Sequence, residues 1–228
     1  WQCFTFYPFV WMQGGSLFTE EGLANLNSEE VVNALQLWRD LLDSGNCNET
    51  PGRSVSDISI LTNGETAMQI NGSWSVFRAD PEKYGVVPLP AATANGNTAS
   101  VAGGWNVMVN NQNGEEKIAG AKDFISWMWL NKDHVTEFNT KAKFSYCMRE
   151  SVIEAGKDVY QSSENAIVFS EEVLQTAKPE IALSGEAKEI VATMIQDALY
   201  NTSAQEAADN AQESMLQYQE ESGARFSG

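Results

Sequence analysis

Three short signals follow one another between residues 63 and 109: NGETAMQINGSW at 63–74, YGVVPLP at 84–90 and GGWNVMV at 103–109. Within the first signal, residues 66–70 alternate in polarity, which predicts a strand that ends at the turn dipeptide Asn71-Gly72. Trp74 therefore lies just past a predicted strand end. Because ligands bind beyond the carboxyl ends of strands in α/β sheets, Trp74 is a candidate ligand-binding residue.

The second and third signals predict two further strands. Proline cannot continue a hydrogen-bonded ladder, so the prolines of YGVVPLP end a short strand. Gly103 and Gly104 open a third strand at 105–109, and glycine lets the backbone approach a ligand closely. Trp74 and Trp105 could each be a core aromatic in an ordinary turn, but the occurrence of all three signals in order favours a binding site.

In this order the three signals resemble family 1 of the extracellular solute-binding proteins, the maltodextrin-binding-protein-like sugar binders of ABC importers. The resemblance implies an α/β fold of the periplasmic-binding type II class, in which two lobes close over a ligand. It also implies that Trp74 lies in the cleft and that Gly103 and Gly104 are hinge residues. The implied function is to capture a sugar or oligosaccharide outside the membrane and deliver it to the permease subunits of an ABC transporter.

The resemblance covers nearly all 228 residues, but only the later part of the family's chain. The opening WQCFTFYPFVWMQGG resembles a second-lobe segment, so we expect a truncated chain that lacks most of the first lobe. Residues 1–100 are then second-lobe α/β structure, 101–155 cross the hinge and form a segment of the first lobe, and 156–228 return to the second lobe and end in helices. Apolar faces within 101–155 are expected to be exposed, or covered by a second copy in a dimer.

A sugar site needs aromatic rings on which the apolar face of a pyranose stacks, and a few polar groups that hydrogen-bond its hydroxyls. Arg149 lies in KAKFSYCMRES, where the family carries a loop with a basic and a small polar residue, although Ser145 and Cys147 replace the usual glycine and proline. Arg149 could equally be a surface cation. The candidate ligand-binding residues are Trp74, Trp105, Gly104, Asn71, Asn106, Trp1 and Arg149.

Helical periodicity is clearest in four segments. Ser28 is a candidate N-cap for an amphipathic helix that ends near Gly45 and buries Trp38. A helix is predicted at 115–130, and its aromatic residues suggest burial on more than one side. A third begins at Ser184-Gly185, and Ser203 with Glu206 forms a capping box for the last. SAQEAADNAQESMLQY, at 203–218, also resembles the final helix of the family.

Charge and composition limit the partners. The chain has 31 acidic and 14 basic residues and a net charge of −17, with no cluster of Lys and Arg, which argues against nucleic acid. No apolar run approaches the roughly 18 residues of a membrane span. By resemblance we expect an extracytoplasmic protein, periplasmic or held at the cell surface as a lipoprotein, which meets the membrane only through a lipid anchor on an N-terminus beyond this sequence.

The residue inventory argues against catalysis. His134 is the only histidine, which we expect on the surface, and neither GxSxG, GxxxxGK[ST] nor GxGxxG occurs. No metal or cofactor is therefore expected. Two carboxylates of a glycosidase are not excluded by 31 acidic residues, but no pattern places two of them together. Cys3, Cys47 and Cys147 allow one disulfide in three ways.

Two alternatives to sugar transport remain open. The same fold could bind another small solute, such as an anion, a peptide or a polyamine. It could also serve as a cell-surface interaction module without a role in transport.

Overall fold

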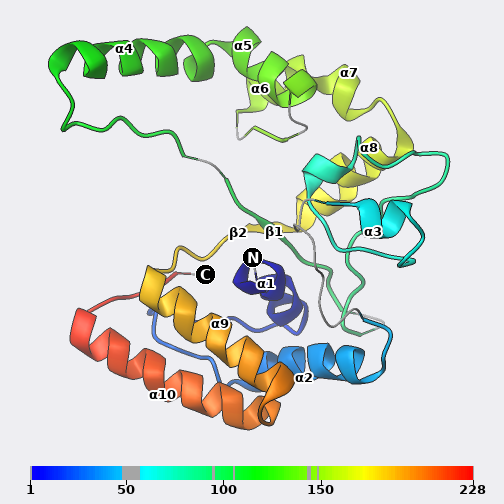
Figure 1. Ribbon diagram of the computed structural model, residues 1–228, viewed down its shortest axis with the longest axis vertical. Helices are drawn as coiled ribbons and strands as arrows, with labels where there is room; N and C mark the ends of the chain where they lie inside the picture. The colour runs from blue at the N-terminus through cyan, green and yellow to red at the C-terminus, as the bar shows by residue number, and fades with distance from the viewer. Residues whose placement is uncertain are drawn as a thin grey trace. The chain divides into compact units, whose positions relative to one another are not determined.

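The computed structural model describes residues 2–47, 57–93, 96–104, 106–142, 145–147 and 149–227. The described chain is rich in helix and divides into two compact units (Figure 1). Unit 1 comprises residues 1–52, 88–103 and 176–228, and unit 2 comprises residues 53–87 and 104–175. Each unit is thus assembled from segments that are distant in the sequence.

The described residues of unit 1 form four helices and a two-stranded parallel sheet. The helices are α1 (Gln2–Met12), α2 (Glu29–Asp43), α9 (Gly185–Tyr200) and α10 (Ala204–Ser222), and the strands are β1 (Ser100–Ala102) and β2 (Ala177–Pro179). Helices α2, α9 and α10 pack on one another. Their buried faces carry the apolar residues that the periodicity predicts, including Leu35, Met194 and Met215.

The predicted start of α9 and the Ser203 half of the capping box predicted for α10 are confirmed. Ser184 Oγ accepts a hydrogen bond from the backbone N–H of Ala187, and Ser203 Oγ accepts one from Glu206. Ser28 also precedes the first residue of its helix, but its hydroxyl makes no capping bond. The start of α2 was therefore predicted correctly and its capping bond was not.

Helix α1 forms the centre of the unit 1 core. Eight of its 11 residues are buried, as expected for a helix that is apolar on all sides. Trp38 of α2 packs edge-to-face on Phe6 and Phe9, with ring centroids 5.2 and 5.3 Å apart. Trp38 was predicted to be a core residue, and it is partly buried and packs against the core.

Two glutamines of α10 hold the loop at residues 22–26. Gln219 donates from Nε2 to the Gly22 carbonyl (2.7 Å), and its Oε1 accepts from the Ala24 N–H (2.9 Å). About two helical turns earlier on α10, the side chain of Gln212 accepts a hydrogen bond from the Leu26 N–H (2.7 Å) and donates one to the Ala24 carbonyl (3.0 Å). Gln219 is only 2% exposed, so these bonds satisfy backbone groups that water does not reach.

The two strands of unit 1 adjoin two of the places where the chain passes between the units. Ser100 pairs with Ala177 and Ala102 with Pro179, and the ladder is extended by the Glu180 N–H, which donates to the Ala102 carbonyl at 2.9 Å. The chain leaves unit 1 after Gly103 and returns at Thr176. Both crossings are therefore next to one short parallel pair.

Unit 2 contains short helices and turns. They are α3 (Ser59–Thr62), η1 (Ser73–Ser75), α4 (Glu115–Ile125), η2 (Ser126–Leu130), α5 (Lys132–Glu137), η3 (Phe138–Ala142), α6 (Glu150–Ala155), α7 (Lys157–Tyr160), α8 (Glu164–Val168), η4 (Phe169–Val173) and η5 (Leu174–Thr176), which leads back to unit 1. Its core gathers around Tyr160, which stacks on Tyr146 at 4.5 Å, with Val76 and Ala166 buried beside it.

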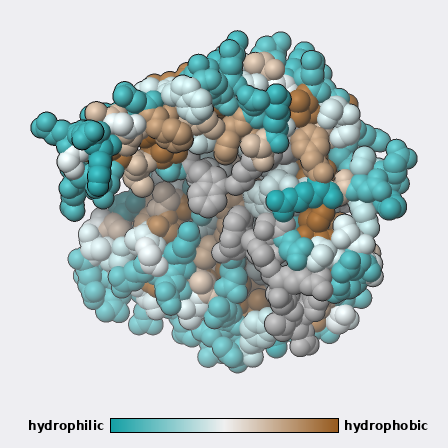
Figure 2. Space-filling view, turned by 45° about the horizontal axis from the view of Figure 1, so that its top comes forward, coloured by the Kyte–Doolittle hydropathy of each residue, from teal (hydrophilic) through white to brown (hydrophobic). Residues whose placement is uncertain are grey.

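The three predicted strands are not formed in the described residues. Residues 66–70, 84–90 and 106–109 have no partner strand, and Trp105 lies outside the described residues. Alternation in polarity predicts an extended backbone, but a strand also needs a neighbour for its ladder. Met68 and Met108 are 84% and 86% exposed, and Figure 2 shows hydrophobic patches interrupting the hydrophilic surface.

The helix predicted at 115–130 is present as α4, which continues into the π-helical turn η2. Its predicted burial on more than one side is wrong, because none of its residues is buried in this structure, and this agrees with the exposure expected for apolar faces within 101–155. Phe124 and Trp127 are 56% and 57% exposed. These two side chains belong to an apolar face that no other described segment of the chain covers.

Candidate functional site

The turn at residues 71–75 positions Trp74 in unit 2. Asn71 Oδ1 accepts a hydrogen bond from the Gly72 N–H (2.8 Å), and the Gly72 carbonyl accepts one from the Ser75 N–H (3.0 Å). The six-membered ring of Trp74 lies against Gly72, so that a Cβ at position 72 would collide with it. Trp74 is half-buried. Glycine at position 72 thus lets the six-membered ring of the indole approach its own turn closely.

Polar side chains on either side of Trp74 have buried atoms without a hydrogen-bond partner in the part of the chain that the structure describes. These atoms are Gln69 Oε1, Asn71 Nδ2 and Ser75 Oγ. Sequence reasoning identified Asn71 but missed Gln69 and Ser75. No sequence signal could have found them, because whether a polar atom has a partner depends on how the turn folds.

The two glycines of the predicted hinge differ. A side chain at Gly103 would lie 2.7 Å from the ring of Phe4 and 3.3 Å from Glu180 Oε2, whereas one at Gly104 would meet open space. A larger residue at position 103 would therefore have to displace the Phe4 ring, whereas one at position 104 would not. Asn106, two residues further on, is exposed.

A group of polar residues lies at the carboxyl end of β2 in unit 1, and the sequence reasoning missed it. Glu180 follows the strand and forms an ion pair with Lys188 of α9 at 3.5 Å. The hydroxyl of Tyr7 is buried without a hydrogen-bond partner in the described chain, and burial, with smaller effects of Cys3 and Glu180, raises the pKa of Tyr7. The strand has only three residues, too few to recognise by alternation.

All three cysteines are free thiols, so none of the three possible disulfides is formed. Cys3 is buried, and its thiol donates to the Lys188 carbonyl at 3.5 Å. Burial raises the pKa of the Cys3 thiol, which keeps it protonated and unreactive.

No group of His, Cys, Asp and Glu residues in the described ranges could hold a metal ion.

Arg149 caps the end of a helix in unit 2. Its guanidinium donates to the backbone carbonyls of Trp129 and Leu130, at 3.4 and 3.1 Å. His134 lies against Trp127, with Nδ1 2.7 Å from the Trp127 carbonyl, so it is half-buried where we expected a solvated surface residue. Both side chains satisfy carbonyls that the helix end leaves without a partner.

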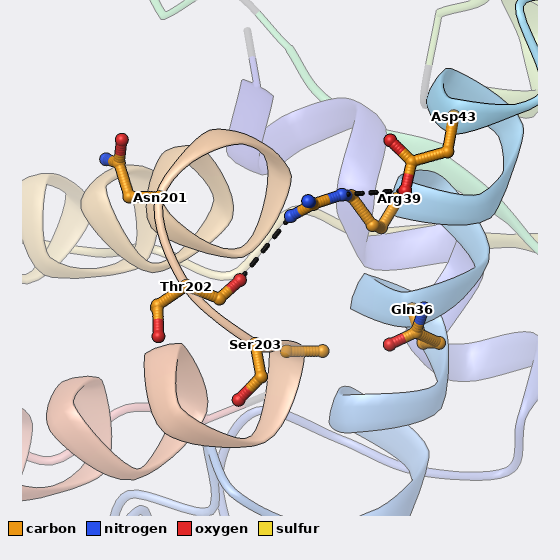
Figure 3. A pocket seen from close by; sticks show the side chains of 7 residues that line it. Gln36, Arg39, Asp43, Asn201, Thr202 and Ser203 are labelled. Atoms are coloured by element: carbon orange, nitrogen blue, oxygen red, sulfur yellow. Dashed lines mark hydrogen bonds and ion pairs between the residues drawn. The ribbon is translucent and has the colours of Figure 1, made fainter.

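A hollow of about 350 Å³ opens in unit 1 beside the junction of α9 and α10 (Figure 3). Arg39 donates from Nε to Asp43 at 2.9 Å and from Nη1 to the carbonyls of Ala198 and Thr202 at 2.9 and 3.4 Å. These bonds close the end of α9. The hollow has no aromatic lining residue, so it lacks a surface on which a sugar ring could stack.

The predicted site residues fall into three places. Asn71 and Trp74 share one turn, Gly104 and Asn106 share one extended segment, and Arg149 precedes α6. Trp1 and Trp105 lie outside the described residues.

Among the helices of the described chain, none has both the length and the apolar character that a membrane span requires.

The amino-acid sequence matches one family of known proteins. A family model described as bacterial extracellular solute-binding protein matches residues 2–166. Among curated proteins, no sequence match is found.

Three solved structures illustrate the likeness. Maltose-bound MalE3 of T. maritima is 25% identical, with a TM-score of 0.79, over 94% of this chain and 56% of its own. The cyclic alpha-maltosyl-1,6-maltose binding protein of Arthrobacter globiformis is 27% identical, with a TM-score of 0.65, over 94% and 55%. An ABC transporter solute binding protein of Thermotoga lettingae bound with alpha-D-tagatose shares the fold at 21% identity, with a TM-score of 0.75, over 94% and 56%. The chain thus spans a little over half the length of these proteins.

Proposed function

Because the chain belongs to the bacterial extracellular solute-binding protein family, we propose that it takes part in capturing a sugar or oligosaccharide outside the cytoplasm. The bound sugar would be delivered to the permease subunits of an ABC transporter. The members of this family are binding proteins, and we propose that this chain likewise returns its ligand chemically unchanged.

The observation that carries the proposal is the Trp74 turn. The six-membered ring of the half-buried Trp74 lies against Gly72, and an aromatic ring is a surface on which the apolar side of a pyranose stacks. Polar atoms of Asn71 and Ser75 lie within the same turn. The two structures at 25% and 27% identity are a maltose-bound protein and a maltosyl-maltose binding protein, which supports a carbohydrate as the ligand.

Other parts of the proposal rest on the resemblance alone. They are the roles of Trp1, Trp105, Gly104, Asn106 and Arg149 in binding, the hinge at Gly103 and Gly104, and the assignment of residues 101–155 to the first lobe. The lipid anchor and a dimer of the chain belong with them. For Arg149, the capping bonds described above favour a structural role over a ligand contact.

Calorimetric titration of the purified protein with maltose, cyclic maltosyl-maltose and D-tagatose tests the proposal. Trp74→Ala should weaken binding by about 2 kcal/mol or more, the loss typical of a central aromatic contact. Trp127→Ala is the matched control, because Trp127 is a more exposed tryptophan of the same unit with a separate environment. The proposal would be refuted if the wild type bound none of these three sugars, or if Trp74→Ala bound them as tightly as the wild type.

A further inference from the structure

The dipeptide Asn-Gly occurs in the sequence at 63–64, 71–72, 95–96 and 113–114. In such a dipeptide the backbone nitrogen of glycine can attack the side-chain amide of asparagine, because glycine has no Cβ to obstruct the approach. We propose that Asn113 is a site of spontaneous deamidation, and that it reacts faster than the other two Asn-Gly dipeptides of the described chain. This modification is independent of the proposed function, since it involves no ligand.

The reaction needs only the chain and water. The Gly114 nitrogen forms a bond to Cγ of Asn113 and the Cγ–Nδ2 bond breaks, so that ammonia leaves with the proton that the glycine nitrogen has lost. Water then opens the resulting cyclic imide at either of its carbonyls, which gives aspartate or isoaspartate at position 113. Each product adds one negative charge to a chain whose net charge is −17.

The structure leaves both reacting groups at position 113 accessible. Asn113 and Gly114 are exposed in the turn that precedes α4. The Gly114 N–H donates no hydrogen bond to any residue that the structure describes. Asn113 Nδ2 donates to the Asn110 carbonyl at 3.4 Å, which is a long and weak bond. A Cβ placed on Gly114 would meet open space, so the glycine nitrogen can turn toward Cγ without a collision.

Hydrogen bonds hold the glycine nitrogens of the other two dipeptides. The Gly64 N–H, next to Asn63, donates to the Leu61 carbonyl at 3.0 Å. The Gly72 N–H donates to Asn71 Oδ1 at 2.8 Å, and Asn71 Nδ2 is buried, so water does not reach the nitrogen that must leave as ammonia. In each case a bond must break before the glycine nitrogen can attack, and this raises the barrier.

Peptide mapping by mass spectrometry, after incubation of the folded protein in mildly alkaline buffer, measures the rate at each dipeptide separately. Asn113 should lose its amide about two- to tenfold faster than Asn63 or Asn71, the factor that corresponds to one hydrogen bond of about 0.5–1.5 kcal/mol. In concentrated urea the three rates should converge, because the bonds that hold Gly64 and Gly72 are then broken. Asn95 lies outside the described residues, and its peptide is measured apart.

Gly114→Ala tests the attacking atom. Gly114 has φ −61°, a conformation that alanine adopts, and the added methyl group meets nothing, so the melting temperature should be unchanged. The methyl group obstructs the attack, so amide loss at Asn113 should slow at least as much as a hydrogen bond slows the other two sites.

Three results would overturn the proposal. The first is amide loss at Asn113 that is no faster than at Asn63 and Asn71 in the folded protein. The second is an unchanged order and spread of rates in urea, because the local sequence and not the structure would then set them. The third is an unchanged rate at Asn113 in Gly114→Ala, which would exclude attack by the glycine nitrogen.

Discussion

Replacing Gln219 by Leu should strongly destabilise unit 1. The side chain is 2% exposed, and its two bonds, at 2.7 and 2.9 Å, satisfy the Gly22 carbonyl and the Ala24 N–H. Leucine has a similar volume but no polar atom, so both backbone groups would remain buried without a partner. At about 1–3 kcal/mol for each group, the free energy of unfolding should fall by about 2–6 kcal/mol.

Urea unfolding, followed by the near-UV signal of the unit 1 tryptophans, would measure this change. Amide exchange at Ala24 gives a local measure, because the Ala24 N–H loses its acceptor. Gln217→Leu is the matched control, because Gln217 is exposed on the same helix and donates to the exposed side chain of Glu221. Equal shifts for the two variants, or an Ala24 amide that stays protected in Gln219→Leu, would refute the role assigned to the glutamine clamp.

Three further predictions concern stability. Ser203→Ala should cost about 0.5–2 kcal/mol through loss of the α10 cap, whereas Glu213→Gln on the exposed face should cost almost nothing, and equal melting shifts would contradict this. Trp38→Ala should cost about 3–5 kcal/mol, measured by urea unfolding, because the indole packs on two phenylalanines of α1. Burial raises the pKa of Tyr146 and Tyr160 to about 12. Because folding favours the protonated phenols, their contribution is complete below about pH 10 and is lost between about pH 10 and 12, so urea midpoints of unit 2 should fall there, and less so in Tyr146→Phe.

Local signals in the sequence predicted local structure well. The helix start at Ser184-Gly185, the cap at Ser203 and the apolar stripes of α2, α9 and α10 depend on neighbours within one or two turns, and the structure confirms them. The family, the periplasmic-binding α/β fold and the extracytoplasmic location are also confirmed by the comparisons. Those predictions came from three motifs in fixed order, which depend little on how any one segment pairs.

Predictions that depend on a distant partner failed. Residues 66–70 have the alternation of a strand but no neighbour to complete a ladder, while β1 and β2 pair across more than 70 residues with only three residues each. The candidate site shows the same limit. Asn71 and Trp74 were found because they belong to one turn motif, but the unpartnered atoms of Gln69 and Ser75 become evident only in three dimensions.

The discontinuous make-up of unit 1 has a consequence for the order in which the protein can fold as it is synthesised. Residues 53–87 and 104–175 of unit 2 are complete once the chain has passed Gln175, and their helices depend mainly on near neighbours. Unit 1 must wait, because α10 covers α2 and α9 and its Gln219 closes a loop almost 200 residues away. Closing so long a loop is slow, and until then the apolar faces of the first 50 residues stay open to aggregation. Nascent chains that stop before Ala204 should therefore hold a folded unit 2 joined to an unfolded unit 1.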